Sequence, residues 1–210
     1  MNEKGQKPFS FQEETWDLYA QNFSGLVVAP TGFGKTFSVF LAVIHNFLNH
    51  PEKVRTSRDL SKLQLLWVTP LRSLSKDIAK AMQTAINEIG LDWTVGVRNG
   101  DISASEKQKQ TKNMPEILVV TPESLHLLLA QKSKTKFFEN LQCVAVDEWH
   151  ELLSSKRGVM VELALSHLRS ISKNLKIWGL TATIGNLEEA LEVLVPYETS
   201  KKIVLAKEKK

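Results

Sequence analysis

The segment VVAPTGFGKT, Val27 to Thr36, constrains the fold of this chain more than any other. It joins an apolar run, which predicts a buried strand at residues 25–29, to apolar residues at helical spacing from Phe37 to Leu48. A strand, a glycine-containing loop and a helix are the setting that a phosphate-binding loop requires. Chance alone would place such a pattern in roughly 1 or 2 of 100 chains of this length. The segment therefore predicts a phosphate site in an α/β fold.

The residue types of this loop suit a nucleotide bound with Mg²⁺. Gly32 and Gly34 allow backbone conformations that point several N–H groups into one concavity, and the next helix adds the partial positive charge of its N-terminus. We expect Lys35 to reach the β- and γ-phosphates and the Thr36 hydroxyl to hold Mg²⁺. Ala29 replaces the first glycine of the general pattern. The expected nucleotide-binding residues of the loop are Thr31, Gly32, Phe33, Gly34, Lys35 and Thr36.

Composition narrows the class of protein. A chain of 210 residues can bury one good core, and no uncharged apolar run approaches the ~18 residues of a membrane span. Residues 1–8 lack the apolar centre of a signal peptide, and the single cysteine, Cys143, lies in an apolar strand as a buried thiol. We therefore expect a cytoplasmic protein with no membrane partner. The net charge of +4 permits an anionic partner, although a few excess lysines are more often solvated surface.

Strands and helices alternate along the chain. Most of the strands are continuous apolar runs, which indicates that helices cover both faces of a mainly parallel sheet. A helix is expected to begin at Ser10, where Ser10 and Glu13 have the form of a capping box. Ligands of such sheets bind beyond the carboxyl ends of the strands. The predicted strands are residues 25–29, 63–69, 93–97, 117–121, 143–146, 177–180 and 203–205, and the further predicted helices are 37–48, 71–89, a solvated one within 101–113, 124–131, 159–172 and 186–195.

An acidic pair follows one of these strands. Cys143 to Val146 leads directly into Asp147-Glu148-Trp149-His150. We expect Asp147 to complete the Mg²⁺ shell and Glu148 to polarise the attacking water as a general base, with Lys35 as the other catalytic residue. Alone, an acidic pair would also suit the start of a helix. Beside a phosphate loop in the same sheet, it predicts the second half of an ATP site.

Asp147-Glu148-Trp149-His150 is a DEXH box, and the chain resembles the first RecA-like domain of a superfamily 2 helicase. It is most similar to the large helicase-related proteins and the ligase-associated DEXH-box helicases of bacteria, above all in the segment VDEWHELLSSKRGVMVELALSHLR, Val146 to Arg169. The resemblance covers about Phe9 to about Val195. It implies a three-layer RecA-like fold, ATP and Mg²⁺ as cofactors, helicase activity and a nucleic-acid partner. Single-stranded DNA and a role in repair are favoured, with RNA as the alternative.

The resemblance implies further residues around ATP. Phe11-Gln12 resembles the Q-motif, in which Gln12 would bind the adenine edge and select ATP over GTP. Phe9 or Phe11 could stack on the base, and core packing is an equal alternative for each. Thr181-Ala182-Thr183 resembles motif III, usually Ser-Ala-Thr, which couples hydrolysis to strand movement. His150 would link the acidic box to this motif.

Three more segments resemble motifs that grip the nucleic-acid backbone. They are Thr69 to Arg72 (motif Ia), Thr121 to Ser124 (motif Ib) and Arg98 to Asp101 (the Gly-Asp loop). A helix that starts after Thr-Pro offers free N–H groups to a phosphate, although Thr-Pro and Asn-Gly are also ordinary turn punctuation. Lys156-Arg157-Gly158 stays open between a nucleic-acid contact and an exposed turn. The expected nucleic-acid-binding residues are Pro70, Leu71, Arg72, Gly100, Asp101, Thr121, Pro122, Glu123 and Ser124.

Other functional classes lack support in the sequence. A GTPase would carry Asn-Lys-x-Asp, which does not occur, and a P-loop kinase would carry an arginine-bearing lid. A non-catalytic nucleic-acid-binding module would have lost Lys35, Asp147 or Glu148, and all three are present.

We expect a disordered lead-in at 1–8, the RecA-like domain at 9–200 and a lysine-rich tail at 201–210. The resemblance also implies a second RecA-like domain with an arginine finger. The fifteen residues after Val195 are too few to form it, so we expect that domain to be absent from an excised fragment or a truncated product.

Overall fold

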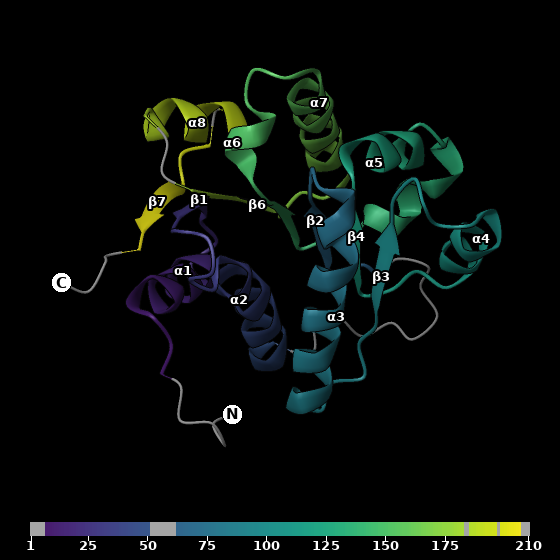
Figure 1. Ribbon diagram of the computed structural model, residues 1–210, viewed down its shortest axis with the longest axis horizontal. Helices are drawn as coiled ribbons and strands as arrows, with labels where there is room; N and C mark the ends of the chain where they lie inside the picture. The colour runs from purple at the N-terminus through teal and green to yellow at the C-terminus, as the bar shows by residue number, and fades with distance from the viewer. Residues whose placement is uncertain (1–6, 51–61, 183–184, 197, 207–210) are drawn as a thin grey trace.

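The computed structural model describes residues 7–50, 62–182, 185–196 and 198–206 of the chain. Within these ranges one seven-stranded sheet has the order β3-β4-β2-β5-β6-β1-β7, and every pair of neighbouring strands is parallel (Figure 1). The expected parallel sheet is confirmed, with the last strand at its edge. The strands are β1 Ser24–Val28, β2 Leu65–Val68, β3 Val95–Arg98, β4 Ile117–Val120, β5 Cys143–Val146, β6 Lys176–Thr181 and β7 Lys201–Leu205.

Helices cover both faces of the sheet and complete the expected three-layer α/β fold (Figure 1). One layer holds α1 Ser10–Ala20, α2 Lys35–Asn49 and α3 Arg72–Ile89. The opposite layer holds α5 Pro122–Leu129, α6 Trp149–Leu152, α7 Lys156–Ile171 and α8 Leu187–Leu194. Two further elements are α4 Ala104–Lys112, which has no buried residue, and a 3₁₀ helix, η2 Lys132–Phe138.

Alternate residues of each strand enter opposite cores. In β2, Leu65 and Trp67 pack under α1 to α3, whereas Leu66 and Val68 pack under α5 to α8, and all four are fully buried. Cys143 is likewise buried, as expected, and burial raises the pKa of its thiol to about 12. Because both faces of each strand must be apolar, the strands read as continuous apolar runs in the sequence.

The start of α1 differs from the expected capping box. The helix begins at Ser10, but Phe9 occupies the N-cap position and its N–H donates to Oε1 of Gln12 at 2.9 Å. Glu13 is exposed. The prediction that Ser10 and Glu13 form the box was therefore wrong by one residue, and Gln12 closes the first turn instead.

Gly25 allows β1 to lie between its two neighbours, which makes it a sharp test of this packing. A Cβ at Gly25 would lie 2.5 Å from the backbone oxygen of Lys202 in β7 and 2.6 Å from the ring of Trp178 in β6. Because a backbone atom cannot step aside, we expect Gly25→Ala to lower the free energy of unfolding by about 1–3 kcal/mol. Urea denaturation followed by tryptophan fluorescence measures this.

Gly185→Ala is the matched control for that substitution, because a Cβ at Gly185 would meet nothing within 4 Å. We expect it to change the free energy of unfolding by less than about 0.5 kcal/mol. Equal losses in the two variants would contradict the close approach at Gly25.

Candidate functional site

Every motif segment except Phe11-Gln12, which lies in α1, follows the carboxyl end of a strand, and these ends lie at one edge of the sheet because all of the strands run in the same direction. The strands β5, β6 and β1 are consecutive neighbours, and they end in the acidic box, in Thr181 and in the phosphate loop. The strands β3, β4 and β2 are also consecutive, and they end in the three segments that resemble nucleic-acid-binding motifs. The edge is thus divided into two halves that meet where β2 pairs with β5.

The phosphate loop has the backbone that its glycines were expected to provide. Gly32 and Gly34 have φ values of 84° and 75°, in the left-handed region that favours glycine. Lys35 begins α2, is only 7% exposed, and its Nζ donates to the Ala29 oxygen at 2.8 Å. Thr36 follows in the first turn of this helix. The loop therefore places a buried ammonium and a helix N-terminus around one point, which suits an anion.

Gln12 connects α1 to the phosphate loop. Its Nε2 donates to the Gly34 oxygen at 3.1 Å, while its Oε1 accepts from the Phe9 N–H. The two aromatic candidates separate here: Phe11 is 2% exposed in the core, whereas Phe9 is 47% exposed and its ring lies 6.0 Å from that of Phe33. Of the remaining loop residues, Thr31 is exposed.

Asp147 is a buried carboxylate at the end of β5. Its Oδ1 accepts from the Glu148 N–H at 3.0 Å, and Nε1 of Trp67 lies 3.4 Å from its Oδ2. Burial raises the pKa of Asp147 to about 6, and the charge of Glu148 adds to the rise, while Lys35 opposes it. Asp147 therefore lies within electrostatic reach of the cation of the phosphate loop.

Glu148 has a strained backbone. Its φ of 46° lies in the left-handed region, which a residue with a Cβ adopts only where its surroundings enforce it. Nδ1 of His150 lies 3.5 Å from Oε2 of Glu148 and 3.0 Å from Oγ1 of Thr181. His150 thus contacts both Glu148 and the end of β6. Thr181 is buried and Ala182 half-buried, and Thr183 lies outside the described residues.

Trp149 has a structural role that the sequence analysis did not assign. Its side chain is fully buried, and its Nε1 donates to the Ala190 oxygen at 2.9 Å. This bond attaches α6, directly after Glu148, to α8. In the sequence Trp149 lies between Glu148 and His150. Nothing in that local sequence distinguishes a tryptophan that anchors a helix from one that contacts a ligand.

The Gly-Asp loop and motif Ia lie against each other. A Cβ on Gly100 would be 3.0 Å from Nη1 of Arg72, so the exposed guanidinium covers that glycine. Asn99 donates from Nδ2 to Oγ of Ser75 in α3 at 2.9 Å, and the Asp101 N–H donates to Oδ1 of Asn99 at 2.9 Å. The Asn-Gly turn is real, and it is docked on the helix that follows β2.

Motif Ib begins α5 with a proline in its first turn. The Thr121 hydroxyl donates to Oγ of Ser124 at 3.2 Å, and both residues and Pro122 are buried. In motif Ia the Leu71 N–H lies 3.4 Å from Oγ1 of Thr69. The two motifs therefore offer short, rigid helix starts rather than loose loops.

For Lys156-Arg157-Gly158 the sequence left open a nucleic-acid contact or an exposed turn, and the contacts of Arg157 bear on this choice. Its Nη2 donates to the Pro70 oxygen at 2.8 Å, and its Nε lies 2.7 Å from Oε1 of Glu123. Burial raises the pKa of Glu123, but hydrogen bonds from its own N–H and Arg157 outweigh that and hold the pKa below its ordinary value. Arg157 is therefore bound within the protein, and the sequence analysis did not identify its partners.

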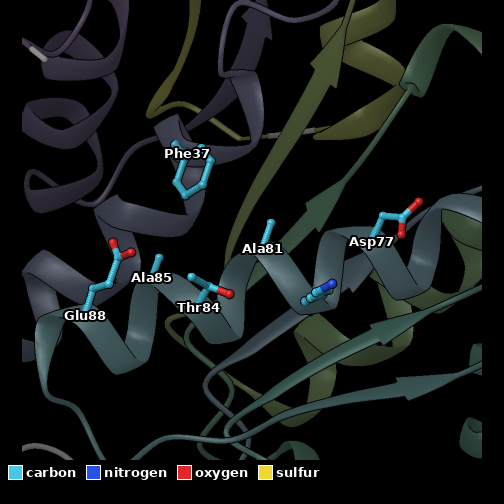
Figure 2. Close-up of a pocket in the computed structure, with 7 residues that line it drawn as sticks. Phe37, Asp77, Ala81, Thr84, Ala85 and Glu88 are labelled. Atoms are coloured by element: carbon cyan, nitrogen blue, oxygen red, sulfur yellow. The ribbon is translucent and has the colours of Figure 1, made fainter. Parts of the chain in front are cut away.

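A hollow of about 500 Å³ lies apart from this edge, between α2 and α3. Phe37 faces Ala81 and Ala85 across it (Figure 2). Its charged rim carries Lys80 and two carboxylates, Asp77 and Glu88, so its charge opposes a polyphosphate. A nucleotide is therefore better placed at the phosphate loop than in this hollow.

The donor set at the edge of the sheet fits Mg²⁺ carried by a nucleotide. Among the described residues, no three His, Cys, Asp or Glu side chains gather into a site that could hold a metal by itself. Mg²⁺ in nucleotide sites takes one or two protein oxygens and fills its shell with phosphates and water. Thr36 and Asp147 supply that number.

None of the helices in the described part of the chain has the length and apolar character of a membrane span.

Comparison with known proteins identifies a family and its relatives. The DEAD/DEAH box helicase family matches residues 9–190. The chain is similar to the Lhr helicase/uracil glycosylase of Escherichia coli, with 30% identity over 200 residues, which are 90% of this chain and 13% of that protein. It is also similar to the ATP-dependent helicase Lhr-Core protein 2 of Thermococcus barophilus, with 37% identity over 174 residues, 78% of this chain and 20% of that protein. The chain thus spans about a fifth or less of the length of these two curated relatives.

Solved structures show the same fold. The structure of Mycobacterium smegmatis helicase Lhr bound to ssDNA and AMP-PNP has a TM-score of 0.76 and 29% identity, and the match covers 96% of this chain and 26% of that one. The DEAD-box helicase Mss116 bound to ssRNA and UDP-BeF has a TM-score of 0.81 at 20% identity, with 96% of this chain and 41% of that one covered. The latter likeness supports the fold alone.

The buried carboxylate of Asp147 predicts a specific pH dependence of stability. Because the folded pKa is raised from 3.8 to about 6, its contribution to stability is fully present below 3.8 and is lost as the pH rises through about 6. Asp147→Asn removes this charge. We therefore expect the variant to have a higher free energy of unfolding than the unaltered chain at about pH 8. This difference between variant and unaltered chain should be roughly 2 kcal/mol larger at about pH 8 than at about pH 4.5. Urea denaturation at the two pH values measures the difference.

Asp92→Asn controls for this experiment, because Asp92 is exposed and its substitution removes the same charge. We expect it to change stability by less than about 0.5 kcal/mol at both pH values. A gain for Asp147→Asn that is independent of pH would contradict the raised pKa.

Proposed function

Because this chain belongs to the DEAD/DEAH box helicase family, we propose that it is the ATP-binding motor domain of a DNA helicase. In this proposal it couples ATP hydrolysis to movement along single-stranded DNA, in the cytoplasm and in the service of DNA repair. The observation that carries the proposal is the division of one sheet edge into a nucleotide half and a nucleic-acid half that meet at β2 and β5. DNA is favoured over RNA because the similar Lhr structure at 29% identity is bound to ssDNA.

The phosphate loop would hold the nucleotide. Lys35 supplies the cation for the β- and γ-phosphates, and Gly32 and Gly34 turn backbone N–H groups toward them. Thr36 and Asp147 would hold Mg²⁺, which, when bound, neutralises charge on the phosphate oxygens. Asp147 must be ionised to serve, so its raised pKa is a reason to expect weaker binding of Mg·ATP below about pH 6.

Gln12 would select the base. Its amide already uses one N–H on Gly34 and one lone pair on the Phe9 N–H, which leaves one donor and one acceptor free. Adenine presents a donor at N6 and an acceptor at N7, a complementary pair, whereas guanine presents acceptors at both O6 and N7. The orientation of the Gln12 amide therefore favours ATP over GTP.

Glu148 would act as the general base that accepts a proton from the attacking water. Its backbone is left-handed at the end of β5, and His150 lies between its carboxylate and the Thr181 hydroxyl. A change in the position of Glu148 is thereby felt at the end of β6. This pair of contacts is our proposed route from hydrolysis to motion.

We further propose that turnover requires a second RecA-like domain. It would supply an arginine to the γ-phosphate, a contribution worth about 10³–10⁵ in rate. The greater length of the similar helicases leaves room for such a domain. This chain would then provide part of the nucleotide and nucleic-acid binding, whereas movement along the nucleic acid would require both domains.

Lys35→Ala tests the nucleotide site. We expect the substitution to weaken Mg·ATP binding by about tenfold or more, because it removes the buried cation that faces the phosphates. Isothermal titration calorimetry with Mg·ATP measures this. Lys80→Ala is the matched control, since it removes the one lysine that lines the hollow between α2 and α3. The affinity of this variant for Mg·ATP should equal that of the unaltered chain. The reverse pattern would place the nucleotide in the hollow.

Hydrolysis by the 210-residue chain tests the need for a second domain. We expect phosphate release at saturating Mg·ATP to stay near the level of the Glu148→Gln variant, with little response to single-stranded DNA. Steady-state phosphate assays with and without an oligodeoxythymidylate measure it. Turnover of about 1 s⁻¹ or more, strongly stimulated by DNA, is within the range of complete phosphoryl-transfer enzymes and would refute the requirement.

A further inference from the structure

Arg157 joins two segments that lie far apart in the sequence. Its Nη2 donates to the Pro70 oxygen at 2.8 Å and to Oε2 of Glu123 at 3.3 Å, and its Nε lies 2.7 Å from Oε1 of the same carboxylate. Pro70 follows β2, and Glu123 lies in the first turn of α5 after β4. One guanidinium therefore spans motif Ia and motif Ib.

The geometry of these contacts requires an arginine. A guanidinium is a planar fork that can meet a carboxylate with two parallel N–H groups and reach another acceptor from the same edge, which an ammonium cannot do. Pro70 is buried, so its oxygen depends on a protein donor. Nη2 of Arg157 donates to both acceptors, whereas Nε is buried beside the carboxylate of Glu123 as a charge contact and makes no hydrogen bond.

The turn between α6 and α7, residues 152–158, fixes Arg157 relative to the acidic box, and we call this turn the elbow. The Ser155 hydroxyl donates to the Leu152 oxygen at 2.6 Å and accepts from the Gly158 N–H at 3.0 Å, which caps α7. A Cβ on Gly158 would lie 2.1 Å from the same Leu152 oxygen, so only glycine permits the start of α7 to press against the end of α6. Arg157 lies nine positions after Glu148 in the sequence, within this elbow.

We propose that Arg157 is a positioning residue for single-stranded nucleic acid. It holds the Pro70 and Glu123 segments at the spacing at which both contact one backbone, and it links that spacing to the elbow behind Glu148. The inference rests on the proposed nucleic-acid role of these segments. In this arrangement Arg157 contacts no phosphate, and Glu123 serves as the partner of Arg157.

A direct phosphate contact by Arg157 would respond differently when the charge of Glu123 is removed. Glu123→Gln takes a negative charge from the surface and frees the guanidinium, so a direct contact would bind nucleic acid more tightly. A positioning role makes the opposite prediction, because the tie between the two segments is lost. The sign of the Glu123→Gln effect therefore separates the two roles.

The experiment measures binding of a fluorescein-labelled oligodeoxythymidylate to the 210-residue chain by fluorescence anisotropy at low salt. We expect Arg157→Ala and Glu123→Gln each to weaken binding by about threefold to thirtyfold, the range for residues that act through others. The double variant should be no weaker than Arg157→Ala alone, since both substitutions break one tie. The affinity of Arg157→Lys should lie between those of the unaltered chain and Arg157→Ala, because lysine keeps the charge and loses the planar guanidinium.

Arg169→Ala is a closely matched control. Arg169 lies at the other end of α7, where it bonds the Glu198 carboxylate at 3.0 Å and the Pro196 oxygen at 3.2 Å. Its removal should leave oligonucleotide binding unchanged. Affinity for Mg·ATP should be unchanged in all of these variants, which a general loss of folding would not allow.

Three outcomes would overturn the inference. They are tighter binding by Glu123→Gln, unchanged binding by both Arg157→Ala and Arg157→Lys, and a parallel loss of Mg·ATP affinity. If the unaltered chain binds Mg·ATP but no oligonucleotide, the nucleic-acid part of the proposed function fails, and the inference fails with it.

Discussion

The single direction of all seven strands is the constraint from which the rest of the structure follows. Parallel neighbours cannot be joined by a short hairpin, so each connection must cross a face of the sheet, and helices come to cover both faces. The same constraint gathers the carboxyl ends of the strands at one edge. Residues from Gln12 to Thr181 are therefore brought together, although each motif is short and local in sequence.

The strand order decides which motifs become neighbours. Because β2 pairs with β5, the end of the acidic strand lies next to motif Ia, and Trp67 of β2 reaches Asp147 across the pair. The two halves of the edge share this one seam. In the proposed function, this pair of strands and the turn that follows Glu148 would connect the nucleotide half to the nucleic-acid half.

The sequence predicted what is local and could not predict what depends on distant partners. The phosphate loop, the continuous apolar strands and the helix expected at residues 71–89 each carry their own chemical reason within the local sequence. The cap of α1 was assigned to Glu13, because the usual spacing cannot reveal that Gln12 is also held by Gly34, 22 residues away. Arg157 was left open for the same reason: Glu123 and Pro70 lie 34 and 87 residues from it.

The site also contains features that oppose folding. A buried carboxylate at Asp147 and a left-handed backbone at Glu148 are each unfavourable by an amount on the order of 1–3 kcal/mol. The surrounding structure tolerates them because the strand beneath is fully buried and Trp149 anchors the next turn to α8. Strain of this kind gathers where a protein must hold a reactive group ready, rather than where it needs stability.

The contact between Trp67 and Asp147 has an optical consequence. An indole that lies beside a carboxylate experiences the electric field of that charge, and the field changes when the carboxylate takes up a proton or binds a cation. Trp67 is fully buried, so bulk solvent does not compete with this effect. We therefore expect the emission of Trp67, one of five tryptophans in the chain, to respond to the charge of Asp147.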